Sequence, residues 1–281
     1  MNSGTDKKTC ARCGRGFFVT MDGEYITQEQ CIYHWGKLRK AVGPKRKNRG
    51  AKKTGKEYSC CGAKQNTSGC TTAKLHVWNA IGPGYNGPFD GYVRTPFRQT
   101  PSHDGNSGIY ALDCEMCYTT HGLELARVTL VAADGRPVYD TLVRPENYVI
   151  DYNTRFSGIT ENDLREYGTK SLCDVQNDLM NLINADTILV GHGLENDLRA
   201  LRIIHGTVID TSVIFPHKQG LPHRRSLKSL VSSILKKDIQ QGSSGHCSFE
   251  DASACIELML WRIRMDFPLI VQSQAPDVPF M

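Results

Sequence analysis

The sequence lacks an apolar run long enough for a signal peptide or a membrane-spanning helix. We therefore expect no membrane partner and an intracellular, reducing location, in which disulfides are disfavoured. The chain still holds 11 cysteines among its 281 residues. Thiols that do not form disulfides are available as metal ligands, so the spacing of these cysteines is informative.

Acidic residues are scarce in the first 80 positions, which hold 5 of the 29 Asp and Glu but 16 of the 34 Lys and Arg. This part therefore carries a formal charge of about +11, which leaves about −6 for the remainder. The shift in composition predicts four segments. They are a basic Cys/His module at 1–80, a Gly/Pro-rich linker at 81–107, a second domain at 108–268 and a disordered tail at 269–281.

Six of the cysteines fall in the basic segment, where two histidines accompany them. The candidate metal ligands are Cys10, Cys13, Cys31, His34, Cys60, Cys61, Cys70 and His76. Eight ligands are the number that two closed tetrahedral sites require, so the segment predicts two structural Zn²⁺ ions. Free structural cysteines are the alternative, and the spacing leaves open which ligands share an ion.

The spacing Cys31-x2-His34-x-Gly36, followed by the adjacent Cys60-Cys61 pair, resembles the CHORD zinc domain. The Cys10-x2-Cys13 opening and the long basic insert before Cys60 depart from that pattern. The interaction partners of CHORD domains are therefore not carried over, and protein partners of this module stay an open option.

The insert contains Lys-Arg-Lys-Asn-Arg-Gly-Ala-Lys-Lys at 45–53 and almost nothing apolar. This composition predicts a disordered loop that contacts phosphates or acts as a nuclear localisation signal. A solvated linker is the alternative. We accordingly expect a nuclear location, with the nucleolus as one option.

The second domain begins with a short apolar stretch at 108–116, which is typical of a buried strand. Asp113 and Glu115 lie two residues apart in it, so their side chains would share one face of the strand. Two crowded carboxylates repel each other unless a cation lies between them, and Mg²⁺ or Mn²⁺ prefers oxygen ligands. Alone, an Asp-x-Glu triplet is more often an ordinary strand or surface pair.

Two later segments add chemistry of the same kind. Asp197 falls in the first turn of a predicted helix, where it would otherwise only complement the helix dipole. His246 and Asp251 flank the start of another predicted helix, where a lone histidine would usually be a loop residue. The three segments together supply four carboxylates and one histidine, which suffice for two-metal phosphodiester hydrolysis.

The order and spacing of these residues resemble the DEDDh family of 3′-to-5′ exonucleases. The matching motifs are Asp113-x-Glu115, a Gly-His pair with Asp197 five residues after His192, and His246-x4-Asp251. The stretches 111–120, 123–129 and 156–160, together with Asp210-Thr211, are similar to the Rex-type RNA exonucleases, including the GOR-antigen group. This similarity covers about residues 108 to 266.

The resemblance implies an α/β fold, an RNase H-like αβα sandwich with a five-stranded mixed sheet, and release of nucleoside 5′-monophosphates from single-stranded RNA 3′ ends. The implied ligands of two Mg²⁺ or Mn²⁺ ions are Asp113, Glu115, Asp197 and Asp251. His246 is implied to be the general base, a role that suits a side chain titrating near neutral pH. Met116 and Phe156 resemble positions that pack on the terminal base or sugar, although apolar residues there are core by default.

Apolar patterning predicts strands near 108–116, 124–133, 137–143, 187–191 and 207–210. It predicts helices near 160–166, 171–184, 195–205, 226–235 and 250–265, with Ser226 as an N-cap. Gly135-Arg136-Pro137 indicates a hairpin between the second and third strands. We interpret Cys114 and Cys117 as packing residues.

These features favour an RNA-trimming exonuclease whose zinc module holds the substrate or a partner. The alternative is a nucleic-acid-binding or protein-binding adaptor that acts through the zinc module, with the nuclease fold as an inactive scaffold. Among enzymes, a DNA-preferring exonuclease is the runner-up, because no residue can be assigned to a 2′-hydroxyl. The complete five-residue set favours catalysis.

Overall fold

The computed structural model describes residues 4–41, 55–80, 91–98, 108–165, 168–241 and 245–267. The basic loop at 45–53 and the predicted tail at 269–281 lie outside these ranges, as does most of the predicted linker. The chain divides into a small unit, Met1–Ile81 with Tyr118–Gly122, and a larger unit formed by the rest. No helix in the described ranges is both long and apolar enough to cross a membrane.

The larger unit is built on a mixed sheet with the strand order β10-β9-β8-β12-β14. These strands are β10 (Pro137–Leu142), β9 (Gly122–Ala132), β8 (Ile109–Thr119), β12 (Ile188–Gly191) and β14 (Val208–Asp210). β12 runs parallel to both β8 and β14, whereas β10 runs antiparallel to β9. The predicted five-stranded mixed sheet is thus confirmed, and a short sixth strand, β11 (Val149–Asp151), pairs with β8.

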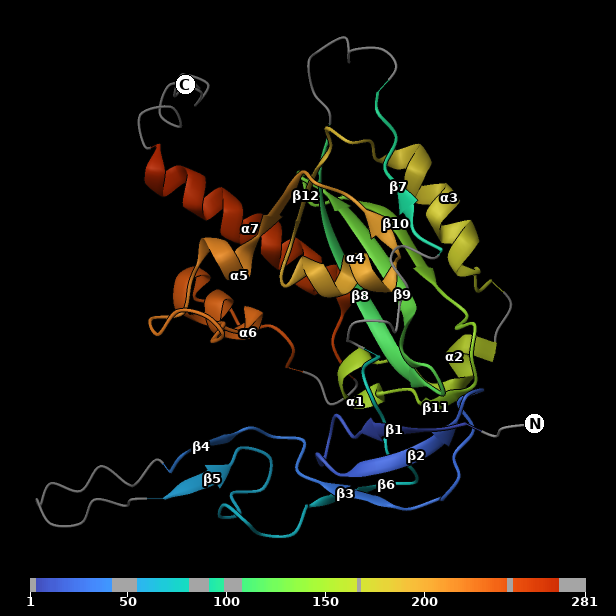
Figure 1. Ribbon diagram of the computed structural model, residues 1–281. Helices are drawn as coiled ribbons and strands as arrows, with labels where there is room; N and C mark the ends of the chain where they lie inside the picture. Colours follow the sequence, from blue (N-terminus) through green and yellow to red (C-terminus); the bar gives the residue numbers. More distant parts are fainter. Residues whose placement is uncertain are drawn as a thin grey trace, which may run out of the picture. The chain divides into compact units, whose positions relative to one another are not determined.

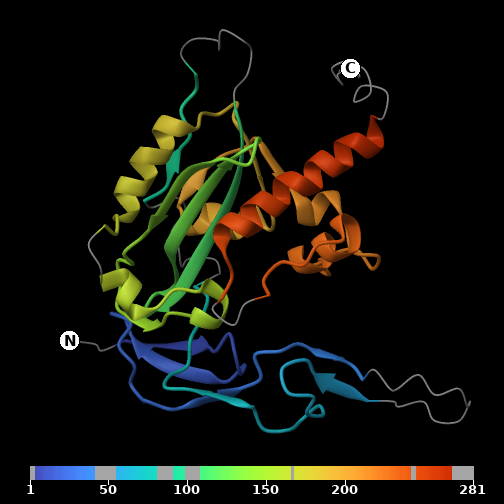
Figure 2. The ribbon, with the colours of Figure 1, turned by 180° about the vertical axis from the view of Figure 1, so that it is seen from behind.

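Helices cover both faces of this sheet, as Figures 1 and 2 show for α3 and α7. Successive residues of a strand point to opposite faces, so Leu112 and Leu189 join the core under α3 (Leu172–Leu182) and α4 (Leu194–Ala200). Their neighbours Ala111 and Val190 join the core under α6 (Leu227–Leu230) and α7 (Ser248–Asp266). The result is the αβα sandwich that the sequence predicted.

Local sequence explains several element boundaries. Ser171 caps α3, because its hydroxyl accepts from the backbone N–H of Asp174 while the Asp174 side chain accepts from the N–H of Ser171. Ser226 caps α6 in the predicted way, and α6 continues into a π-helical turn, η2 (Val231–Leu235). The predicted hairpin at Gly135 is present, with this glycine at a positive φ of 87°. The remaining short helices are α1 (Thr154–Ser157), α2 (Glu161–Arg165) and α5 (Thr211–Ile214).

The prediction of a helix over 195–205 is wrong at its C-terminal end. α4 stops at Ala200, and β13 (Ile203–Ile204) pairs with β7 (Val93–Arg94), which lies within the predicted linker. The Gln176 side chain donates to the carbonyl oxygens of Leu201 and Arg202, which no longer bond within a helix. An apolar rhythm cannot reveal a strand partner that lies about 110 residues earlier, so the sequence missed this pairing.

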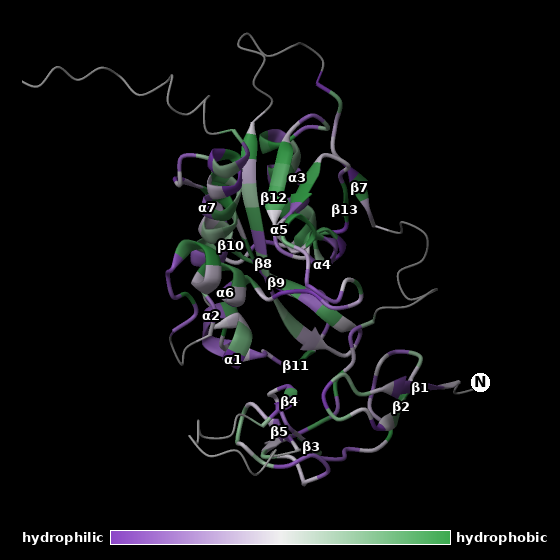
Figure 3. Ribbon diagram, turned by 90° about the vertical axis from the view of Figure 1, so that its left-hand side faces the viewer, coloured by the Kyte–Doolittle hydropathy of each residue, from purple (hydrophilic) through white to green (hydrophobic). Residues whose placement is uncertain are grey.

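In Figure 3 the hydrophobic residues of the larger unit gather in the central strands and α3.

In its described residues, the small unit contains three two-stranded antiparallel sheets. They pair β1 (Thr5–Thr9) with β2 (Gly16–Thr20), β3 (Cys31–Tyr33) with β6 (Thr71–Ala73), and β4 (Leu38–Lys40) with β5 (Lys56–Tyr58). Its buried core contains only a few residues, among them Phe17, Val19 and Trp78. Isolated two-stranded sheets are marginally stable in water, so a unit of this kind needs additional stabilisation such as bound metal.

Candidate metal centres and active site

Acidic side chains from three elements, β8, α4 and α7, lie close enough for their charges to act on one another. Asp113 and Glu115 alternate with core residues along β8, so both point to the face that carries Ala111. Asp251 lies in the first turn of α7, and Asp197 lies within α4. Glu115, Asp197 and Asp251 are each less than 9% exposed. The structure therefore brings buried carboxylates from distant segments into one region.

The electrostatics of these groups reflect burial and mutual repulsion. Burial, followed by the charge of Asp197, raises the pKa of Asp113 well above its usual range. Burial also raises the pKa of Glu115 to about 8 and that of Asp197 to about 7. Burial raises the pKa of Asp251 to about 6, although the hydrogen bond from Gln240 lowers it by favouring the ionised form. Four carboxylates that resist ionisation together form a site suited to cations.

The break that follows β12 places Asp197. The Asp210 carboxylate accepts from the backbone N–H groups of Gly193 and Leu194, at 3.0–3.1 Å, and so fixes the start of α4. Gly193 adopts a positive φ of 77° at this point. His192 contributes a hydrogen bond between its Nδ1 and the Thr211 hydroxyl, at 2.8 Å, which braces the same turn.

Asp251 offers one free oxygen. Its Oδ2 accepts from Gln240 Nε2 at 2.7 Å, whereas its Oδ1 is buried and has no hydrogen-bond partner among the described residues. A buried carboxylate oxygen without a partner is costly unless a ligand satisfies it. This oxygen fits a divalent cation held by oxygen ligands.

His246 is positioned by the turn that contains α1. Its backbone N–H donates to the carbonyl oxygen of Phe156 at 2.7 Å, and its ring meets the Phe156 ring edge to face, with centroids 6.0 Å apart. The preceding residue, Gly245, approaches Gly158 so closely that a Cβ would lie 2.1 Å from the Gly158 nitrogen. Burial lowers the pKa of His246, so the imidazole is neutral at pH 7 and can accept a proton.

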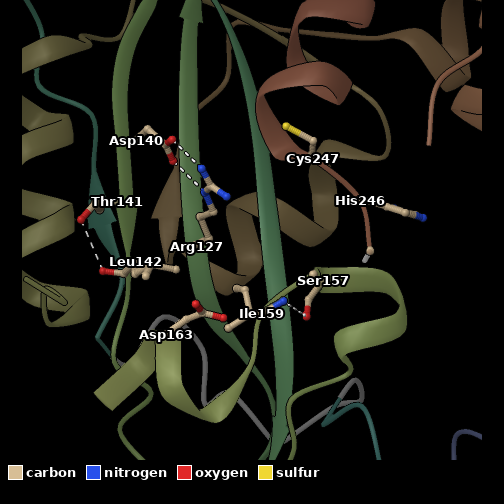
Figure 4. A pocket seen from close by; sticks show the side chains of 11 residues that line it. Arg127, Asp140, Thr141, Leu142, Ser157, Ile159, Asp163, His246 and Cys247 are labelled. Carbon is tan, nitrogen blue, oxygen red and sulfur yellow. Dashed lines mark hydrogen bonds and ion pairs between the residues drawn. The ribbon is translucent and has the colours of Figure 1, made fainter. Parts of the chain in front are cut away.

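A cavity of about 490 Å³ borders the same loop. Figure 4 shows Arg127 and Asp140 paired across β9 and β10 on one side, and Ser157, Ile159 and Asp163 below them. In this view the His246 ring points away from the Arg127 and Asp140 pair. Gly245, His246 and Cys247 of this loop nevertheless line the cavity. Of the two candidate substrate residues, Phe156 is 38% exposed and Met116 is partly buried.

The small unit brings its eight Cys and His residues together in two groups. In the described part of the chain, these are the groups whose ligand atoms all lie within 4.8 Å of one another. The first contains Cys10, Cys13, Cys31 and His76, and the second contains His34, Cys60, Cys61 and Cys70. The carboxylates of the larger unit are less tightly gathered.

The spacing within both groups fits a tetrahedral zinc ion. Tetrahedral ligands about 2.3 Å from zinc lie roughly 3.8 Å from one another. The Sγ atoms of Cys10 and Cys31 are 3.6 Å apart, and Sγ of Cys13 lies 3.3 Å from Nδ1 of His76. In the second group, Nδ1 of His34 lies 3.6 Å from Sγ of Cys60 and 3.4 Å from Sγ of Cys61.

The two groups are interleaved along the chain. Cys31 and His34, which are three residues apart, belong to different groups, because β3 lies between the two sites. Gly36 permits the close approach that the second group requires, since a Cβ there would lie 2.3 Å from the backbone nitrogen of Cys60. These residues could hold two metal ions. The sequence alone had left the pairing open.

Three contributors to the acidic site escaped the sequence reasoning. Asp210 and Gln240 make the hydrogen bonds described above, and Cys114, interpreted as a packing residue, also hydrogen-bonds the carboxylate of Asp197. Asp210-Thr211 is part of the resemblance to the Rex-type exonucleases, which assigns it no role. Gln240 carried no signal, because a glutamine in a loop between helices is unremarkable until its contacts are known.

Comparison with known proteins agrees with this geometry. A model of the RNase T exonuclease family matches residues 110–259. The human protein named RNA exonuclease 1 homolog is 49% identical over 259 residues, covering 92% of this chain and 20% of that protein. Exonuclease GOR from Pan troglodytes is 47% identical over 258 residues, covering 92% of this chain and 35% of that protein.

The solved catalytic unit of Neurospora crassa Pan2, which contains protease and nuclease domains, shares the fold with a TM-score of 0.53 and 27% identity. The matched region covers 64% of this chain and 31% of the Pan2 chain. The protein described here belongs to the exonuclease family. It spans between a fifth and just over a third of the length of the two curated relatives described above.

Proposed function

We propose that this chain is a metal-dependent 3′-to-5′ exoribonuclease that removes nucleoside 5′-monophosphates from single-stranded RNA 3′ ends. The observation that carries the proposal is the buried acidic cluster with an unpartnered oxygen on Asp251. RNA as the substrate is supported by the name of the human relative, RNA exonuclease 1 homolog, which is 49% identical to this chain.

The acidic residues would hold two Mg²⁺ or Mn²⁺ ions, with Asp113, Glu115, Asp197 and Asp251 as ligands. Such ions supply a clamp for the scissile phosphate, a lower pKa for the attacking water and charge compensation at the leaving 3′-oxygen. Asp113 and Glu115 enter from the rigid central strand, whereas Asp197 and Asp251 enter from helix N-termini. The four ligands therefore come from elements that the core holds in place.

His246 would act as the general base. A neutral imidazole can take the proton of the attacking water, and burial keeps this imidazole neutral at pH 7. The Phe156 carbonyl oxygen holds the backbone of His246, while the Phe156 ring packs against the imidazole. Phe156 and Met116 would contact the terminal nucleotide. Phe156 would therefore both position the general base, His246, and bind the substrate.

The small unit would contribute binding. Two structural Zn²⁺ ions would complete its core, and its basic side chains would add sequence-independent attraction for phosphates that weakens with salt. The basic loop at 45–53 supports a nuclear location for the protein. The basic side chains of this unit give less specific support for a protein partner than for RNA.

The first experiment is a time course on 5′-labelled single-stranded RNA and matched DNA, with Mg²⁺, Mn²⁺ or EDTA. Wild type would be run beside Asp113→Asn, with the exposed Asp186→Asn as the matched control. A metal-dependent ladder that shortens from the 3′ end, absent only in Asp113→Asn, is the expected result. Intact substrate in every lane despite binding would overturn the proposal and favour the zinc-module adaptor. Faster cleavage of DNA would favour a DNA-preferring exonuclease.

A further inference from the structure

The Asp251 carboxylate is held through only one of its two oxygens. Its Oδ2 lies 2.7 Å from the side-chain amide of Gln240, and its Oδ1 is buried without a partner in the described part of the chain. A free carboxylate can rotate about its χ2 torsion and exchange the two oxygens. The hydrogen bond from Gln240 selects one orientation.

Gln240 is itself fixed at three points. Its backbone N–H donates to Oε2 of Glu250 at 2.9 Å, and its carbonyl oxygen accepts from Nζ of Lys228 at 2.9 Å. The preceding residue, Ile239, is only 6% exposed and packs in the core under α7. Gln240 adopts a positive φ of 56°, a conformation that costs energy for a non-glycine residue and that these contacts maintain.

We propose that Gln240 is a positioning residue of the metal centre: its amide engages Oδ2 of Asp251 and thereby presents Oδ1 to a divalent cation. The inference rests on the proposed metal-binding role of Asp251. Partners that orient a metal ligand commonly change metal affinity about 10–100-fold when they are removed. A similar change is expected for Gln240.

The same hydrogen bond keeps Asp251 apart from His246. Nδ1 of His246 lies 3.7 Å from Oδ2 of Asp251, which is too far for a hydrogen bond. Because the Gln240 amide occupies that oxygen, the imidazole is not held by the carboxylate. Gln240 thus separates the ligand role of Asp251 from the base role of His246.

The test is direct measurement of Mn²⁺ binding to the zinc-loaded chain, by the electron paramagnetic resonance signal of free Mn²⁺. The variants are Gln240→Ala and Gln240→Met, the second of which keeps the side-chain length without the amide donor. Asp251→Asn defines loss of the ligand, and the exposed neighbour Gln241→Ala is the matched control. Melting temperature of the zinc-loaded chain without added Mn²⁺ reports whether each variant folds.

Both Gln240 variants are expected to weaken Mn²⁺ binding about 10–100-fold, with Gln241→Ala unchanged and cleavage partly restored at high Mn²⁺. Wild-type Mn²⁺ affinity in a folded Gln240→Met protein would overturn the inference. Wild type that binds Mn²⁺ through Asp251 and Gln240 but cleaves no RNA would overturn the proposed function and leave this inference standing. Absence of Asp251-dependent Mn²⁺ binding in wild type would overturn both.

Discussion

In the proposed mechanism, individual side chains of the acidic site divide the chemistry between metal binding and proton transfer. Asp113 is a partly buried carboxylate that feels the charges of three others, whereas Nδ1 of His246 lies 3.7 Å from Oδ2 of Asp251. The two residues should therefore fail in different ways when they are replaced.

Asp113→Asn and His246→Ala should each reduce kcat by at least about 10²-fold, because proton transfer and charge stabilisation each contribute on this scale. His246→Ala should bind Mg²⁺ as wild type does, whereas Asp113→Asn should bind it more weakly. Calorimetric titration with Mg²⁺ beside a cleavage assay measures both quantities. Wild-type cleavage rates in both variants would contradict the assignment of the site.

Gly245 tests the placement of His246 without touching the imidazole. A Cβ at this residue would lie 2.1 Å from the Gly158 nitrogen, and the residue has a φ of 97°. Gly245→Ala should displace the His246 loop and lower kcat about 10–100-fold, because misplacing a catalytic group by about 1 Å has effects of this order. Mg²⁺ affinity should stay unchanged, since α7 holds Asp251.

Gly135→Ala is the matched control for Gly245→Ala. Gly135 has a similar φ of 87°, but a Cβ there would meet nothing within 4 Å. Both replacements should cost about 1 kcal/mol of stability from the backbone conformation. Only Gly245→Ala should lower kcat, and equal loss of activity in both variants would contradict a local effect on His246.

At the scale of elements, short strands decide which candidate metal ligands lie together. β3 carries Cys31 at its start and leads directly into His34, so it separates two ligands that are close in sequence. Closeness in sequence therefore fails to predict the grouping of Cys31 and His34, although it holds for Cys10 and Cys13. The arrangement makes a stoichiometric prediction.

The double replacement Cys10→Ser/Cys31→Ser should leave one Zn²⁺ per chain, because both residues belong to the first group. The double replacement Cys31→Ser/Cys70→Ser should leave none, because it damages both groups. Zinc content by atomic absorption on the purified chain measures the difference, with Cys173→Ser, an exposed cysteine of the larger unit, as the control. One zinc in both double variants would contradict the interleaved pairing.

Elements also explain where the sequence reasoning succeeded and failed. The apolar residues of β8, β12 and α7 follow the spacing of a strand or a helix within each element itself. Their spacing therefore predicted these elements from the sequence. The end of α4 could not be found in this way, because Arg202 adopts a positive φ and Ile203 pairs with Val93 far along the chain. Tertiary pairing overrode the local apolar rhythm there.

For the molecule as a whole, the acidic cluster is a source of instability that the proposed cations would relieve. Raised carboxylate pKa values mean that the folded state binds more protons than the unfolded state. The stability of the metal-free protein should therefore fall as the pH rises from about 4. The fall should extend through the folded pKa values of about 6 for Asp251, 7 for Asp197 and 8 for Glu115.

Melting temperature between pH 5.5 and 8.5 tests this dependence. In EDTA the melting temperature should decrease with pH, and saturating Mg²⁺ in place of EDTA should reduce the slope. Glu115→Gln should also flatten the slope in EDTA, because it removes one repelling charge. An EDTA slope of zero in wild type would contradict the repulsion among these carboxylates.

The sequence by itself determined the two-part organisation in composition and the identities of the candidate ligands, and its resemblance to the DEDDh exonucleases implied the αβα class. Alternation along a strand and the order of motifs carry that information locally, so Asp113 and Glu115 could be placed on one face without coordinates. Only the tertiary structure decided which oxygen of Asp251 is free, that Gln240 orients it, and how eight ligands divide between two sites. Those facts depend on contacts between segments far apart in the chain, whose distances no local pattern encodes.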